Sequence, residues 1–237
     1  MSHHLVEARE LSHAYPDGTA SLSGITFTIR HGESVAIVGA NGAGKSTLLQ
    51  HLNGTLRATS GEVRVGELPL NTETLLEVRR AVGMVFQDPD DQLFMPTVLE
   101  DVAFGPRNLG LSPQESESRA LEALRRVGAE HLAAKAPYHL SMGEKRRCAV
   151  AAVLSMGPDI LVLDEPSTGL DPRGRRLLIG LLGEFTHTKL IATHDLDLVR
   201  QLCTRTLVLQ DGRLRADGPT HEIFADHELM EDCGLEG

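Results

Sequence analysis

The stretch Gly39-Ala40-Asn41-Gly42-Ala43-Gly44-Lys45-Ser46 constrains this chain more than any other feature. It follows the apolar run Val35–Val38 and precedes a helical-looking segment, residues 47–53. A strand, a glycine-rich loop and a helix in this order form a phosphate-binding loop. The glycines let backbone N–H groups turn inward around anionic oxygens, and the helix N-terminus adds a partial positive charge. The sequence therefore predicts a phosphate site on an α/β sheet.

Individual side chains in this loop suggest specific tasks. Lys45 is placed to reach the β- and γ-phosphates of a nucleotide, and the Ser46 hydroxyl to ligate Mg²⁺. A flexible glycine-rich turn is the alternative, but it does not explain Lys45 and Ser46 at this fixed offset from the glycines. The sequence therefore favours ATP and Mg²⁺ as ligands.

Two carboxylates follow a second apolar run far downstream, Ile160–Leu163. Asp164, at the end of this predicted strand, is expected to hold the Mg²⁺ shell. Glu165, one residue further, is expected to face the γ-phosphate and polarise an attacking water. An acidic pair that caps a strand at the surface is the alternative, and the upstream phosphate loop makes it the weaker one.

The remaining pattern predicts an α/β core with added layers. Strands are expected at residues 25–29, 34–38, 82–86, 160–163, 190–193 and 206–209. The alternation in residues 25–29 suits an antiparallel layer, whereas continuous apolar runs suit buried parallel strands. The middle, residues 97–156, is expected to be helical, with clear helices at 115–126 and 143–154. A hairpin turn is predicted at Gln210–Arg213, followed by a terminal helix at 222–230.

Composition excludes several classes of function. The 237 residues carry a net charge of −10, which argues against nucleic acid or anionic lipid as the main partner. No apolar run approaches the roughly 20 residues of a membrane-spanning helix. The start, with His3 and His4, lacks a signal-peptide pattern, and these histidines are expected to be solvated. Three separated cysteines suggest neither a disulfide framework nor a metal site, which favours a reducing cytoplasm.

The short motif Leu140-Ser141-Met142-Gly143-Glu144 resembles the Leu-Ser-Gly-Gly-Gln signature of the ABC ATPase family. Met142 and Glu144 depart from that signature, while Ser141 and Gly143, the positions expected to touch phosphate, are kept. The resemblance implies that this loop serves the ATP held by the opposite subunit of a dimer.

Further family markers follow in order along nearly the whole chain. Gln87 resembles the Q-loop glutamine and His194 the switch histidine, while residues 167–171 resemble the D-loop at the dimer interface. Tyr15 resembles the A-loop aromatic that stacks on adenine. Taken alone, Gln87 has the alternative of an exposed strand end, His194 that of a structural histidine, and Tyr15 that of a core or surface tyrosine.

The resemblance implies a complete set of site residues. Catalytic roles fall on Glu165, His194 and Gln87. Ser46, Gln87 and Asp164 are expected to bind Mg²⁺. The residues expected to bind the nucleotide are Tyr15, Gly39, Ala40, Asn41, Gly42, Ala43, Gly44, Lys45, Ser46, Thr47, Ser141 and Gly143.

The implied fold is a single domain, residues 1–237, of class α/β. It has a RecA-like P-loop NTPase core at about 1–90 and 157–220, with an N-terminal antiparallel β-layer. A helical sub-lobe is inserted at about 91–156, and a helical tail follows at about 221–237.

The segment Val85–Phe94 resembles the energy-coupling-factor branch, which imports vitamins and transition-metal ions. The resemblance implies docking of an integral membrane coupling subunit near Gln87–Phe94, through acidic Asp88, Asp90 and Asp91 and an apolar anchor, Leu93-Phe94. A solvated acidic turn is the alternative. The whole chain is most similar to cobalt or nickel uptake ATPases, and a vitamin importer stays open.

The implied assembly is a homodimer on the cytoplasmic face of the membrane, with a separate membrane subunit that binds the substrate. A heterodimer with a paralogous ATPase stays open. A non-transport ABC ATPase acting on nucleic acid is the second hypothesis, although this acidic chain lacks long coiled-coil or basic insertions. A P-loop kinase or GTPase is the third, and it leaves the signature, the D-loop and His194 unexplained.

Overall fold

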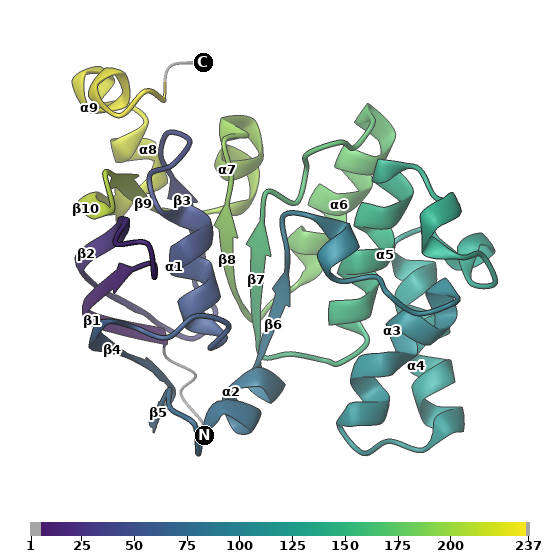
Figure 1. Cartoon of the computed structure of the whole chain (residues 1–237). Coiled ribbons are helices and arrows are strands. Elements are labelled where there is room, and N and C mark those ends of the chain that lie inside the picture. Colours follow the sequence, from purple (N-terminus) through teal and green to yellow (C-terminus); the bar gives the residue numbers. More distant parts are fainter. Residues whose placement is uncertain (1–5, 236–237) are drawn as a thin grey trace. The chain divides into compact units, whose positions relative to one another are not determined.

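The computed structural model describes residues 6–235 and divides the chain into two compact units (Figure 1). The first unit holds the chain up to Val82, the segment Asp159–Glu165 and the chain from Thr186. The second unit holds Gly83–Pro158 and Pro166–Phe185. The predicted residues His3 and His4 lie outside the described part.

A mostly parallel sheet forms the centre of the first unit, with neighbouring strands in the order β10, β9, β3, β8, β7. The edge strand β10 is antiparallel to β9, and the other pairs are parallel. These strands are β3 (Ser34–Val38), β7 (Ile160–Asp164), β8 (Thr188–Ala192), β9 (Arg205–Gln210) and β10 (Arg213–Pro219). Every residue of β3, β7 and β8 is buried, as expected for parallel strands covered on both faces.

A smaller antiparallel sheet belongs to the same unit, with its strands in the order β2, β1, β4, β5. Their bounds are β1 (Val6–Ala14), β2 (Ala20–Ile29), β4 (Ser60–Val65) and β5 (Leu68–Pro69). Buried and exposed residues alternate through the second half of β2, so one face of this sheet packs inward. The structure thereby confirms the antiparallel layer, of which the sequence pattern had predicted only residues 25–29.

The helices of the first unit are α1 (Lys45–Leu52), α2 (Leu75–Ala81), α7 (Leu196–Leu202), α8 (Thr220–Ile223) and α9 (His227–Asp232). Helix α1 contacts strands of both sheets, namely β7 and β8 as well as β2 and β4. Because six of its eight residues are buried, α1 has little freedom to move. The glycine-rich loop therefore precedes a helix held between two sheets.

The predicted terminal helix at 222–230 is wrong in its continuity. The chain forms two short helices there, α8 and α9, separated by Phe224–Asp226. The Asp226 carboxylate accepts a hydrogen bond from the backbone N–H of Leu229, at 3.0 Å, and so starts α9 as a new helix.

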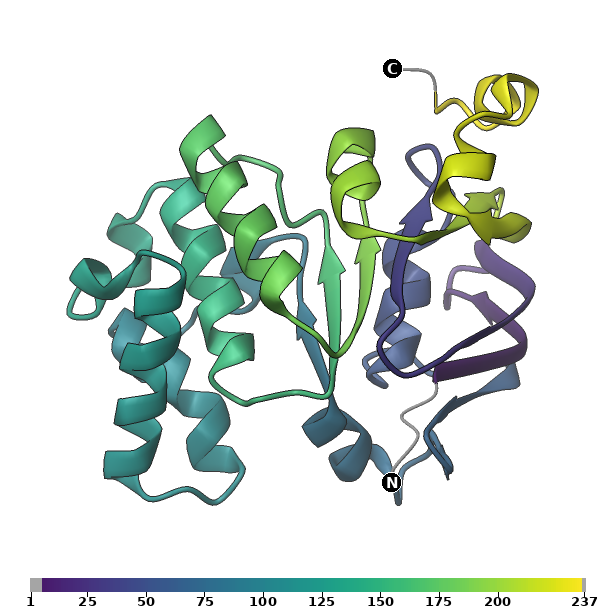
Figure 2. The same cartoon turned by 180° about the vertical axis from the view of Figure 1, so that it is seen from behind.

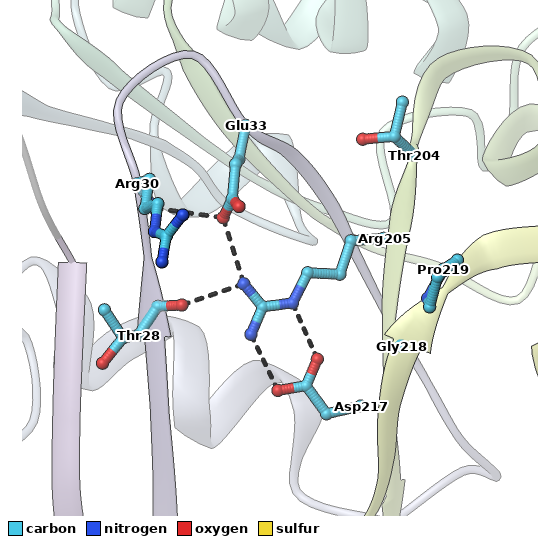
Figure 3. A pocket seen from close by; sticks show the side chains of 8 residues that line it. All are labelled: Thr28, Arg30, Glu33, Thr204, Arg205, Asp217, Gly218 and Pro219. Carbon is cyan, nitrogen blue, oxygen red and sulfur yellow. Dashed lines mark hydrogen bonds and ion pairs between the residues drawn. The ribbon is translucent and has the colours of Figure 1, made fainter.

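An ion-pair cluster lies at the end of the sheet where β9 begins (Figure 3). Arg205 donates two hydrogen bonds of 2.7 Å to the Asp217 carboxylate and one of 3.0 Å to Glu33. It also donates to the carbonyl oxygen of Thr28, at 2.9 Å. These bonds tie the start of β9 to the far half of β10 and to the turn between β2 and β3. A hollow of about 560 Å³ lies beside the cluster.

Helices dominate the second unit, which begins within β6 (Val82–Val85). The main helices are α3 (Val98–Asn108), α4 (Pro113–Arg126), α5 (Met142–Leu154) and α6 (Pro172–Glu184). Short 3₁₀ turns are η1 (Pro89–Asp91), η2 (Glu130–Leu132) and η3 (Pro137–His139). Helices α3, α4 and α5 contact one another pairwise, and Figure 2 shows these teal and green helices from behind. The structure thus confirms the predicted helices at 115–126 and 143–154.

Candidate functional site

The glycine-rich loop turns tightly against strand β9. At Gly39, with φ 156°, a Cβ atom would lie 2.2 Å from the carbonyl oxygen of Leu209, so only glycine fits. The predicted hairpin turn after Gln210 is also present, with positive φ at Asp211 and Gly212. The N–H of Gly212 donates to the carbonyl of Ala43, at 3.1 Å. The hairpin therefore supports the loop from one side.

Lys45 opens α1 and folds back over the loop. Its ammonium donates to the carbonyls of Gly39, at 2.8 Å, and Ala40, at 3.1 Å, and the residue is only 8% exposed. Ser46 and Thr47 follow in the first turn of the helix, where backbone N–H groups lack partners within the helix. A cation and free helical N–H groups together favour an anion at this place.

The ends of β7 and β8 lie at the same edge of the sheet as this loop. Ile37 pairs with Ala192 of β8, and Ala192 pairs with Asp164 of β7. The carboxyl ends of three neighbouring parallel strands thus place the loop, Asp164 and the residues after Ala192 together. Ligands of open α/β sheets bind at such an edge.

Glu165 and His194, two predicted catalytic residues, lie in contact. The Nδ1 atom of His194 lies 2.8 Å from Oε2 of Glu165, and the Thr193 hydroxyl donates to the same oxygen at 3.1 Å. Glu165 is 6% exposed, while the His194 side chain is 68% exposed. Glu165 also has φ 47°, a strained value for a residue other than glycine, and such strain is commonly found at functional sites.

Tyr15 lies against the first turn of α1. Its hydroxyl and the hydroxyl of Thr47 form a hydrogen bond of 2.9 Å, and Ser21 donates to Thr47 at 2.9 Å. The Tyr15 residue is 37% exposed, so part of its ring is free to meet a ligand. Sequence reasoning did not identify Thr193 or Ser21, because single hydroxyl residues carry no motif.

The signature loop and the D-loop meet inside the second unit. Ser141 begins α5, and its hydroxyl and backbone N–H both donate to the Glu144 carboxylate at 2.8 Å. These hydrogen bonds lower the pKa of Glu144, so the carboxylate stays ionised. At Gly143 a Cβ atom would lie 3.2 Å from the carbonyl oxygen of Gly169. The two loops that the resemblance assigns to the dimer interface therefore form one surface.

The segment after β6 is anchored to α5. Arg146 donates to the carbonyl of Phe86, at 3.0 Å, and the Gln92 amide donates to the carbonyl of Ala149, at 2.7 Å. Gln87, between these anchors, is exposed. The segment is thus held at Phe86 and Gln92 and presents Gln87 to its surroundings.

The predicted apolar anchor of this segment needs a correction. Leu93 is 6% exposed and belongs to the core, whereas Phe94 is 62% exposed. The partner of Phe94 is Phe104 of α3, which is 40% exposed and meets it edge to face, with ring centroids 5.1 Å apart. Sequence analysis missed Phe104 because its contact with Phe94 forms only when residues Val98–Asn108 fold as a helix.

The acidic residues of the segment also differ from one another. Asp88 caps η1 by accepting from the N–H of Asp90, at 2.9 Å. Asp90 pairs with Lys145 of α5, at 2.6 Å. Two of the three predicted docking carboxylates are therefore engaged within the unit.

The cysteines offer no reactive thiol. All three are free and buried, and burial raises the pKa of Cys148 to about 12 and that of Cys203 to about 11. At residues 6–235 the structure also contains no helix with the length and apolar character needed to cross a membrane.

Comparisons with known proteins identify the family of this chain. The family model described as ABC transporter matches residues 22–168. The energy-coupling factor transporter ATP-binding protein EcfA of Methanocaldococcus jannaschii is 48% identical over 237 residues, covering 98% of this chain and 85% of that protein.

Two solved structures also match over most of the chain. CbiO1 of Clostridium perfringens, part of the ABC transporter complex CbiONQ, has a TM-score of 0.81 and 41% identity, covering 99% of this chain and 96% of that one. An ATP-binding cassette solved as a dimer after hydrolysis, with ADP and phosphate bound, has a TM-score of 0.83 and 30% identity, covering 91% and 98%.

Proposed function

The chain belongs to the ABC transporter family as an ATP-binding subunit with ATPase activity, and on this premise we propose that it energises an importer of the energy-coupling-factor type, most closely one for cobalt or nickel ions. The observation that carries the proposal is similarity over nearly the whole chain to an energy-coupling factor ATP-binding protein and to a CbiONQ subunit. A vitamin importer of the same branch is the alternative, since a separate membrane subunit would choose the substrate.

The first unit supplies the chemical half of the site. Lys45 and the N–H groups of the loop bind the phosphates, and Tyr15 stacks on the adenine. Glu165 accepts a hydrogen bond from the attacking water and orients it toward the γ-phosphorus. Because His194 uses Nδ1 to bind Glu165, its contact to the γ-phosphate is made by Nε2.

The available donors fit a magnesium ion. Mg²⁺ prefers oxygen ligands and keeps bonds to phosphates and water, so it needs only one or two protein groups. Within the first unit, the Ser46 hydroxyl and the Asp164 carboxylate, which is 2% exposed, would supply such oxygens. When bound, the ion neutralises charge on the β- and γ-phosphates. The role of the protein is to hold that ion in a buried, acidic site.

The second unit supplies the half that acts on another copy. Ser141 and Gly143, at the N-terminus of α5, contact the γ-phosphate of ATP held by the partner subunit. The adjacent D-loop, residues 167–171, crosses the same interface. ATP thereby joins two copies in a homodimer, or in a heterodimer with a paralogous ATPase. Hydrolysis removes the shared ligand and lets the copies separate.

The exposed pair Phe94 and Phe104 supports the docking of a membrane subunit. Exposed aromatic rings next to charged residues are typical of interface anchors. An integral coupling subunit that binds this pair would receive the movement of the neighbouring Gln87 segment. Such a contact would hold the chain peripherally at the cytoplasmic face of the membrane. It involves no nucleic acid.

The transport proposal is tested with the membrane fraction. The tagged chain, purified in mild detergent, should retain integral subunits, and proteoliposomes of that complex should accumulate Co²⁺ or Ni²⁺ only with ATP. Uptake of a vitamin in place of the ions would support the alternative. A chain that retains DNA or ribosomes and no membrane protein would overturn the proposal.

Two serines offer a matched test of the shared site. Ser141 and Ser112 cap α5 and α4 through the same reciprocal contacts, with Glu144 and Glu115 respectively. Ser141→Ala and Ser112→Ala should each cost about 1 kcal/mol of stability. Only Ser141→Ala should abolish ATP-dependent dimerisation and hydrolysis. Equal ATPase rates in the two variants would remove the signature loop from the site.

Glu165→Gln tests the catalytic assignment in the same assays. The amide still accepts hydrogen bonds from Thr193 but no longer polarises water. We expect nucleotide binding to persist, hydrolysis to slow sharply and an ATP-bound dimer to accumulate. Lys45→Ala should weaken ATP binding itself, because a charge-assisted contact is lost.

A further inference from the structure

A closed chain of contacts lies behind Tyr15, and no part of the proposed reaction uses it. The ring of His13 meets the ring of Tyr15 at right angles, with centroids 4.9 Å apart and an interplanar angle of 88°. On its other side His13 meets the ring of His51, at 4.7 Å and 71°. His51 and Tyr15 both bind Thr47 of α1, so the chain of contacts returns to the phosphate loop helix.

The hydrogen bonds of the two imidazoles fix their orientation. Nδ1 of His13 lies 3.1 Å from the carbonyl oxygen of Arg57, and Nδ1 of His51 lies 2.7 Å from that of Thr47. Since a carbonyl oxygen only accepts, both Nδ1 atoms carry hydrogen. In the described residues both Nε2 atoms are buried and have no hydrogen-bond partner.

The two rings are also deeply buried. His13 is 8% exposed and His51 is 2% exposed. Burial is the main cause that lowers the pKa of His51, so this ring is held neutral at physiological pH. His51 therefore packs against His13 as a neutral ring.

The backbone at Tyr15 is held by other groups. The N–H of Tyr15 donates to the carbonyl of Thr19 and the N–H of Gly18 donates to the carbonyl of Tyr15, both at 2.9 Å. The N–H of Ala14 donates to the hydroxyl of Thr59, at 3.0 Å. Removal of the His13 side chain would leave these backbone bonds intact, while it would free the Tyr15 ring and end the contacts of His13 with the Arg57 carbonyl and His51.

We infer that His13 is a positioning residue that sets the plane of the Tyr15 ring for stacking on the nucleobase. The inference rests on the proposed role of Tyr15 as the adenine platform. A perpendicular contact occupies at most one face of the Tyr15 ring, and the residue is 37% exposed, so a purine can reach the ring. The hydrogen bond between the Tyr15 hydroxyl and Thr47 holds the far end of the ring, and His13 prevents the ring from rotating about its long axis.

The inference is tested by comparing ATP with inorganic tripolyphosphate, which lacks the base. His13→Leu should raise the Kd of ATP roughly two- to twelvefold, which is the range that one aromatic pair contributes. The Kd of tripolyphosphate and the kcat at saturating ATP should stay unchanged. His13→Phe, which restores an aromatic ring, should bring the Kd of ATP back toward the wild-type value. Normal tripolyphosphate binding shows at once that each variant is folded.

Two other results would overturn the inference. If ATP and tripolyphosphate weaken together in His13→Leu, the histidine supports α1 as a whole. If His13→Leu binds ATP normally, the ring needs no support from it. Tyr15→Ala separates these from a failure of the premise: unchanged ATP affinity in that variant would remove Tyr15 as the platform, whereas the phosphate site would stand.

Discussion

Replacement of Gly39 by alanine should damage both the fold and the nucleotide site. The added Cβ atom would lie 2.2 Å from the carbonyl oxygen of Leu209, whereas ordinary contacts begin near 3.4 Å. That carbonyl cannot retreat, because β9 is paired with β3 on one side and with β10 on the other. The glycine-rich loop must therefore move by about 1 Å.

The magnitude follows from two separate costs. The backbone conformation at Gly39 costs a residue with a side chain about 1–3 kcal/mol. The close approach to β9 adds about 1–3 kcal/mol, as overpacking does in other cores. The total of about 2–6 kcal/mol corresponds to a fall in Tm of roughly 5–20 °C for a chain of this length.

The loop movement also reaches Lys45. Its ammonium is held at 2.8 Å by the carbonyl of Gly39, so a displaced Gly39 moves the cation away from the phosphates. Loss of one charge-assisted hydrogen bond, about 1.5–3 kcal/mol, would raise the Kd of ATP roughly ten- to hundredfold. Calorimetric titration and thermal unfolding measure the two effects separately.

Gly66 provides the matched control. It has φ 59° in the turn between β4 and β5, and a Cβ atom there meets nothing within 4 Å. Gly66→Ala should cost only the conformational strain, about 1–2 kcal/mol, and should bind ATP normally. If Gly39→Ala has the same Tm as Gly66→Ala and binds ATP as tightly as the wild type, the steric reasoning is wrong.

Three further predictions follow from single contacts. Phe94→Ala should release the membrane subunit in a pull-down and leave the ATPase rate of the free chain unchanged. The control Tyr138→Ala, which removes an aromatic side chain that is 75% exposed, should keep the membrane subunit bound in the same assay. Arg205→Met should lower stability by about 1–3 kcal/mol, because four hydrogen bonds are lost, and should leave the Kd of ATP unchanged in titrations. Burial raises the pKa of Asp101, so the folded chain keeps a proton that the unfolded chain has lost, and the free energy of unfolding falls as the pH rises through the pKa of the folded state. Asp101→Asn should flatten this dependence of the free energy of unfolding on pH, measured by urea unfolding. Parallel curves for the variant and the wild type would contradict this.

The parts of the fold predicted from sequence are those with a strong local pattern. Ser34–Val38 is a continuous apolar run, and the structure places β3 at these same residues. Strand β1 was not predicted, since positive φ at Glu10 and irregular register interrupt its alternation. Strand β10 alternates only between exposed and half-buried residues, so it lacks the apolar signal of a buried strand.

The candidate site shows the same limit in a different form. Motifs identified Glu165 and His194 separately, because each follows a strand and belongs to a known pattern. Their hydrogen bond depends on β7 and β8 being neighbours, which no local pattern states. The contact of Phe94 with Phe104 was missed because it depends on how α3 packs against the preceding segment, and that of Tyr15 with His13 because it depends on how the chain turns after β1.

The two consecutive acidic residues show how a strand end separates chemical roles. Successive side chains of a strand point to opposite faces, so Asp164 and Glu165 would diverge if β7 simply continued. Instead the chain turns at Glu165, where φ is 47° and the backbone N–H donates to the carbonyl of Ala192, at 2.8 Å. This bond continues the pairing with β8 for one more residue while the backbone leaves the strand. The carboxylate is thereby carried to Thr193 and His194, and Asp164 stays buried at the strand end. Glycine would hold this turn without Cβ strain, but it would lack the carboxylate that contacts Thr193 and His194.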